Sequence, residues 1–76
     1  MCNYFEISTK RCTPELVNKF KKVADALGFV VYYHGQDRLV FEQWSDNKER
    51  YLKLIDEIKE CVKEEGLEYD NLLTPD

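Results

Sequence analysis

Two runs of strand-forming residues in the middle of the chain constrain its fold more than any other feature. Residues 29–34 are almost entirely β-branched or aromatic, and residues 38–44 include leucine, valine, phenylalanine and tryptophan. Such side chains pack well on the pleated surface of a sheet, so both runs are predicted strands. The short segment between them contains Gly35, which can supply the unusual backbone angle of a tight turn. The sequence therefore predicts a β-hairpin.

Helical periodicity and a helix start signal precede this hairpin. Thr13 can cap a helix whose first residue is Pro14, because proline lacks the N–H that a first-turn residue would leave unbonded. Apolar residues follow at helical spacing, namely Leu16, Val17, Phe20, Val23, Ala24 and Leu27. Gly28 suits the left-handed backbone conformation beyond a last turn. We expect a helix over residues 14–27.

A second helix is expected from residue 47 to about residue 65. Asp46 and Glu49 have the spacing of a capping box, in which each of the two side chains accepts a hydrogen bond from the backbone N–H of the other residue. The inward positions are Tyr51, Leu54, Ile55, Ile58, Cys61 and Val62. Gly66 marks the end of this helix.

An alternating segment at residues 3–8 completes the pattern. Phe5 and Ile7 lie on one side of it, which is typical of a half-buried strand. The element order β-α-β-β-α, with a right-handed crossover, predicts an α+β two-layer sandwich. Its three-stranded antiparallel sheet has the strand order 1-3-2, and two helices cover one face. The alternative is a ferredoxin-like fold, in which residues 67–69 add a short fourth strand from the tail.

Length and composition predict a single domain over residues 1–76, because the chain has no room for a second core. With 43% hydrophobic and 13% aromatic residues it should fold rather than stay disordered. The net charge of −4 is uneven, since residues 64–76 contain acidic but no basic side chains. Residues 67–76 are accordingly interpreted as an acidic C-terminal tail.

The sequence indicates no membrane span, secretory signal, metal site or cofactor site. No apolar run approaches the roughly 20 residues that a spanning helix needs, and the first residues lack a basic and apolar leader. An odd number of cysteines, Cys2, Cys12 and Cys61, indicates reduced thiols and a cytoplasmic location. His34 is the only histidine, so a zinc site or a histidine-activated nucleophile has too few partners. The chain is predicted not to be an enzyme.

Carboxylates recur along the second predicted helix and continue into the tail. They are Asp56, Glu60, Glu64, Glu68 and Asp70, and we call this set the acidic stripe. Helical residues four apart lie on the same side, so their charges add up there. One interpretation is an ordinary solvated helix face that neighbouring lysines partly neutralise. The other is a mimic of nucleic-acid phosphates that contacts a basic protein surface.

The sheet face opposite the helices is predicted to be apolar. Alternation places there Tyr4, Glu6, Val30, Tyr32, His34, Val40, Glu42 and Trp44. A two-layer fold leaves this face in water, and an exposed apolar patch indicates a contact surface. The alternatives are that the strand faces are misassigned or that the tail covers the patch. Glu6 and Glu42, together with the negative net charge, disfavour direct binding of nucleic acid.

These features predict a non-enzymatic binding protein, a regulator or inhibitor that occupies a surface of a partner protein. The predicted partner-binding residues are the acidic stripe together with Tyr4, Tyr32 and Trp44. The predicted partner is a basic nucleic-acid-handling protein, rather than nucleic acid itself or a membrane.

In size, acidity and lack of catalytic motifs the chain resembles phage-encoded inhibitors of host proteins, including anti-CRISPR proteins. This likeness is one of composition and implies no role for any particular residue. Two alternatives stay open. One is a homodimeric structural module that pairs through the free edge of the first strand or through the aromatic face. The other is an enzyme that uses Cys12 or Cys61 as nucleophile.

Overall fold

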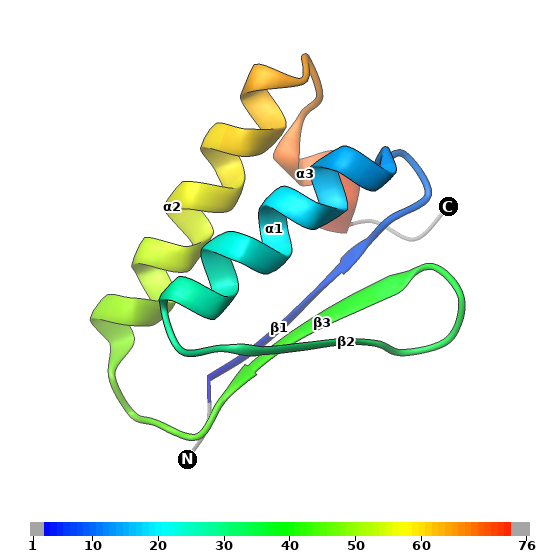
Figure 1. Cartoon of the computed structure of the whole chain (residues 1–76). Helices are drawn as coiled ribbons and strands as arrows, with labels where there is room; N and C mark the ends of the chain where they lie inside the picture. The colour runs from blue at the N-terminus through cyan, green and yellow to red at the C-terminus, as the bar shows by residue number, and fades with distance from the viewer. Residues whose placement is uncertain (1–2, 74–76) are drawn as a thin grey trace.

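A three-stranded antiparallel sheet forms one layer of the molecule in the computed structural model, which describes residues 3–73. Its strands are β1 (Asn3–Ser8), β2 (Val30–Tyr33) and β3 (Arg38–Gln43), in the spatial order β1-β3-β2. The helices are α1 (Pro14–Ala26), α2 (Lys48–Glu64) and α3 (Tyr69–Leu73), and they lie on one side of the sheet (Figure 1). The predicted α+β fold and the strand order 1-3-2 are confirmed.

The central strand β3 is bonded on both sides. Across it, Val40 lies opposite Glu6 of β1 and opposite Tyr32 of β2. The predicted hairpin between β2 and β3 is closed by the N–H of His34, which donates to the carbonyl oxygen of Arg38 at 2.8 Å. β1 and β2 are therefore the two edge strands of the sheet.

Both long helices begin at side-chain caps. The hydroxyl oxygen of Thr13 accepts a first-turn N–H at 3.2 Å, which confirms the predicted start of α1. The second helix is capped by Asn47, whose side-chain oxygen accepts from the N–H groups of Glu49 at 3.0 Å and Arg50 at 3.3 Å. The predicted cap at Asp46 is wrong by one residue. A cap must reach the N–H groups two and three positions ahead, and Asn47 is the residue placed to do so.

The C-terminal segment adds a short helix instead of a strand. Residues 67–69 do not join the sheet, and α3 begins at Tyr69. The ring of Tyr69 lies 6.5 Å from that of Phe5 on β1, and Leu72 is buried in the core. Burial of these apolar groups holds α3 against β1 and α2. The four-stranded, ferredoxin-like alternative is therefore wrong.

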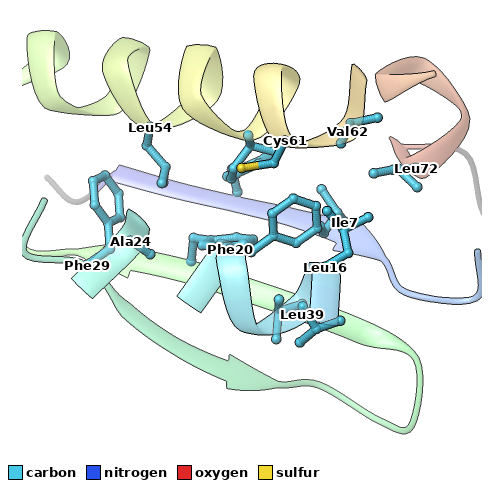
Figure 2. Close-up of a cluster of buried hydrophobic side chains, with 14 residues drawn as sticks. Ile7, Leu16, Phe20, Ala24, Phe29, Leu39, Leu54, Cys61, Val62 and Leu72 are labelled. Atoms are coloured by element: carbon cyan, nitrogen blue, oxygen red, sulfur yellow. The ribbon is translucent and has the colours of Figure 1, made fainter. Parts of the chain in front are cut away.

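The core lies between the helices and one face of the sheet. Figure 2 shows Leu16 and Phe20 of α1 meeting Leu54 of α2 and Leu39 of β3 in a single cluster. On β1 and β3 the rings of Phe5 and Phe41 stack with their centroids 4.9 Å apart. Stacked aromatic rings of this kind add to the stability that their burial gives. One sheet face thus supplies the side chains that pack against the helices.

Candidate protein-interaction surface

The other face of the sheet carries the alternate residues of each strand. In β3, Leu39 and Phe41 belong to the core cluster, so Val40 between them points away from the helices. The strand register then defines what we call the reverse face, with Tyr4, Glu42 and Val30 in one cross-strand row and Glu6, Val40 and Tyr32 in the next. Arg38 and His34 continue it at the hairpin end, and Trp44 follows β3 at the other end. The helices all lie on the opposite side (Figure 1).

Large apolar side chains on the reverse face are open to solvent. Trp44 is 90% exposed, Val30 63%, Tyr4 47% and Tyr32 42%. Trp44, Val30 and Glu42 border the same surface hollow, so the indole and the valine lie close together. The prediction that Tyr4, Tyr32 and Trp44 are exposed on the face without helices is confirmed.

Val40 does not fit that prediction, because its side chain is fully buried. It is absent from the helix-side core cluster, so its burial comes from the reverse face itself. Val40 occupies the middle of the central strand, between the longer side chains of Glu6 and Tyr32. Neighbours on both sides can shield a short side chain at such a position. The reverse face therefore has a small apolar centre of its own.

A polar network fixes one half of the reverse face. The hydroxyl group of Tyr4 donates to a carboxylate oxygen of Glu6 at 2.7 Å, and the guanidinium Nε of Arg38 lies 3.6 Å from the other oxygen. The hydrogen bond to the Glu6 carboxylate is the main reason why the pKa of Tyr4 is raised from 10.0 to about 12. The negative charge of Glu42 acts in the same direction. Tyr4 is thus held in its protonated form and in one orientation.

The acidic stripe lies in the helix layer, away from the reverse face. Asp56, Glu60 and Glu64 are exposed on α2, and Glu68 and Asp70 are exposed next to and on α3. The predicted partner-binding residues therefore form two separate surfaces, one on the sheet and one on the helix layer, which covers the other face of the sheet (Figure 1).

Two further large apolar residues, which are not among the predicted partner-binding residues, are exposed. Tyr33 pairs with the core residue Leu39 and so lies on the helix side of the sheet, yet it is 45% exposed, and Lys21 of α1 lies 5.6 Å above its ring. It sits at the end of the edge strand β2, where α1 covers it from one side only. Leu52, on the outer side of α2, is 59% exposed. The predicted strand order already makes β2 an edge strand, but alternation alone does not show how much of Tyr33 α1 covers.

Groups that could carry catalysis or hold a metal are few in the described residues. Burial raises the pKa of the Cys12 and Cys61 thiols, and the nearby carboxylate of Glu64 raises that of Cys61 further. Within residues 3–73 no three His, Cys, Asp or Glu side chains come together as metal ligands. In the same range no helix is long and apolar enough to cross a membrane.

Comparison with known proteins assigns no family. No protein-family model matches the chain, and neither a characterised protein nor a solved structure matches it significantly. The features of the molecule that bear on its function are therefore its two exposed surfaces, the reverse face and the acidic stripe.

Proposed function

We propose that this protein is a non-enzymatic binding protein that uses the reverse face of its sheet to occupy a surface of a partner protein. The observation that carries the proposal is the 90% exposure of Trp44 beside Val30, which is 63% exposed. Tryptophan and tyrosine are enriched among the residues that dominate binding energy at protein interfaces. Exposed aromatic groups gathered on one uncovered sheet face are typical of an interaction site.

The rigidity of the reverse face supports this proposal. Its residues stand on bonded strands, Val40 fills its centre, and Tyr4 is hydrogen-bonded to Glu6. Side chains that are already ordered lose less conformational entropy when a partner binds. Tyr4 can therefore act as a preformed contact.

The charges on this face suggest the chemistry of the partner. Glu6 is neutralised by Arg38, whereas Glu42 has no ion pair among the described residues. A complementary surface would offer apolar pockets for the aromatic rings and a basic group for Glu42. Nucleic-acid phosphates would be repelled by the same carboxylate, which favours a protein partner.

The thiols are consistent with a binding protein. Because burial raises their pKa, Cys12 and Cys61 hold less of the reactive thiolate at neutral pH than an ordinary thiol. A nucleophilic enzyme needs the opposite shift.

The experiment compares Trp44→Ala with Leu52→Ala as a matched control. Both residues are exposed apolar side chains, but Leu52 lies on the helix layer. Each variant is used as bait in affinity capture from cells that express the protein. We expect a partner that the wild type and the Leu52 variant retain and that Trp44→Ala loses at least about tenfold, as for an interface hot spot. Equal retention by both variants would refute a role for the reverse face.

Trp44 also supplies a direct readout, since it is the only tryptophan in the chain. In the free protein its indole is in water, so its fluorescence emission should lie at long wavelength. Binding of the captured partner should shift the emission to shorter wavelength, because the ring leaves water. An unchanged spectrum at saturating partner would show that Trp44 is outside the contact.

A second candidate function uses the acidic stripe. Asp56, Glu60 and Glu64 are exposed and have no ion pair among the described residues, so their charges give this side of α2 a negative potential. This negative potential would suit an inhibitor that mimics nucleic acid on a basic nucleic-acid-handling protein, as a phage-encoded anti-CRISPR protein would.

The two candidates differ in their response to salt and to charge removal. Glu60→Gln with Glu64→Gln should weaken binding and reduce its salt dependence if the acidic stripe is the contact. Glu15→Gln with Asp46→Asn removes as many exposed charges elsewhere and serves as the control. Binding that is unchanged in the first double variant would exclude the acidic stripe.

A further inference from the structure

The outer edge of β2 offers unpaired backbone groups. β2 bonds only to β3, and the hydrogen bond from His34 N–H to Arg38 sets the alternation along the strand. Residues 30, 32 and 34 thus turn their N–H and C=O groups toward β3, and Val31 and Tyr33 turn theirs outward. Among the described residues no hydrogen bond satisfies these outward groups.

Helix α1 borders this edge on the helix side. One hollow between α1 and β2 is lined by Lys21 and Tyr33, and a second is lined by Asp25 and Val31. Lys21 lies 5.6 Å above the Tyr33 ring and separates the two hollows. Side chains of an added strand on this side would lie against α1.

Natural edge strands are usually protected, and β2, although short, lacks the side chains that commonly give this protection. Lysine, proline, a bulge or an inward-pointing charge commonly blocks pairing at an edge. Residues Val30–Tyr33 contain only valine and tyrosine. The other edge strand, β1, carries Glu6 and contacts α3. The unprotected edge is therefore that of β2.

We propose that the β2 edge pairs antiparallel with the β2 edge of a second copy of this chain. The resulting symmetric dimer joins the two sheets into one continuous sheet. This inference does not require the proposed function, because strand pairing at the β2 edge does not depend on whether the reverse face binds a partner protein. It also differs from the sequence-based expectation of pairing through the first strand.

The edge is complementary to itself. Its outward groups, on Val31 and Tyr33, lie symmetrically about Tyr32. With the twofold axis at Tyr32, Val31 of one copy pairs with Tyr33 of the second copy, and each such pair exchanges two N–H···O bonds. The two Tyr32 rings then lie opposite each other on the reverse face, where aromatic cross-strand pairs are favourable.

Charges on α1 complement each other across the same axis. Lys21 lies next to Tyr33, and Asp25 lies next to Val31. Because the axis exchanges these two ends of β2, Lys21 of each copy faces Asp25 of the other. A second copy of the chain therefore supplies partners for the outward backbone groups of β2, for the Tyr32 ring and for the charges of Lys21 and Asp25.

The first test is sedimentation equilibrium from about 10 µM to about 1 mM, since a four-residue strand should give only a weak dimer. Tyr32→Lys places like charges at the axis and should weaken the dimer at least about tenfold. Tyr4→Lys makes the same change at the far edge of the reverse face and should alter the dissociation constant of the dimer less than about twofold. A monomer at every concentration overturns the proposal. So does a dimer that both variants weaken equally.

The second test is a charge exchange, in which urea unfolding of each variant is measured alongside dimerisation, because Lys21 and Asp25 are also neighbours within α1. Lys21→Glu alone and Asp25→Lys alone should each weaken the dimer about threefold or more. The double variant restores opposite charges and should return to within about twofold of the wild type. A double variant that dimerises no better than the single ones overturns the proposed pairing.

Discussion

The two faces of the sheet are built from the same strands and similar residue types, yet they differ in what holds their side chains. On the helix side, Ile7, Leu39 and Phe41 are fully buried by three helices. On the reverse face the apolar side chain of Val40 is buried, and neighbouring strand side chains bury it. Packing in the core thus accounts for Phe5 and Phe41 on the helix side of the sheet. On the other face, Trp44 is 90% exposed, so packing does not account for it.

Truncation in the helix-side core should give the largest effect on stability. Phe20 is fully buried in the cluster, so Phe20→Ala should lower the free energy of unfolding by about 3–5 kcal/mol. Tyr32→Ala on the reverse face should cost about 1 kcal/mol or less. Urea denaturation followed by circular dichroism measures both. Equal losses would mean that the reverse face is also part of the core.

Val40 tests whether the reverse face has an apolar centre of its own. Val40→Ala removes two buried carbon atoms and should cost about 2 kcal/mol, between the two values above. Val30→Ala makes the same change at a position that is 63% exposed and should cost clearly less. If the two substitutions cost the same, Tyr32 and Glu6 do not shield Val40 in solution.

The polar network predicts a pH effect on the reverse face alone. Glu6→Gln removes the carboxylate and should lower the pKa of Tyr4 from about 12 toward 10.0. The folded pKa is raised above the ordinary value, so this contribution to stability is complete below pH 10. It is lost as the pH rises from 10.0 toward 12. Titration of tyrosine absorbance compares the wild type with the variant, and an unchanged titration curve would contradict the hydrogen bond.

The smallest effect on stability is expected at the residue that matters most for the proposed function. Trp44 is 90% exposed, so Trp44→Ala should change the free energy of unfolding by less than about 0.5 kcal/mol. The same denaturation measurement checks this value. A large loss would show that the indole is structural, and its role in binding would then need another explanation.

Local features of the sequence predicted most of the fold. The hairpin, the cap at Thr13 and the alternation of β1 depend on neighbouring residues, and the structure confirms all three. The start of α2 was misplaced by one residue because Asp46 and Asn47 are both good caps. The segment from residue 67 onward lacks a clear period, and its short helix is held by contacts with β1 that the sequence does not reveal.

The sequence predicted which residues of the candidate site are exposed, but it did not predict how the two surfaces are placed relative to each other. Alternation identified Tyr4, Tyr32 and Trp44 as one exposed group. It could not show that the acidic stripe forms a separate surface on the helix layer, because that depends on how α2 is oriented over the sheet. It also could not show that α1 leaves hollows beside the β2 edge.

The sequence by itself determined which segments form strands and helices and which side of each is apolar, because residue type, spacing and caps act over a few positions. Only the tertiary structure decided that Val40 is buried, that Tyr33 is exposed and that Leu72 closes one end of the core. These outcomes depend on the neighbours that distant segments bring, and burial is a property of the whole assembly of elements.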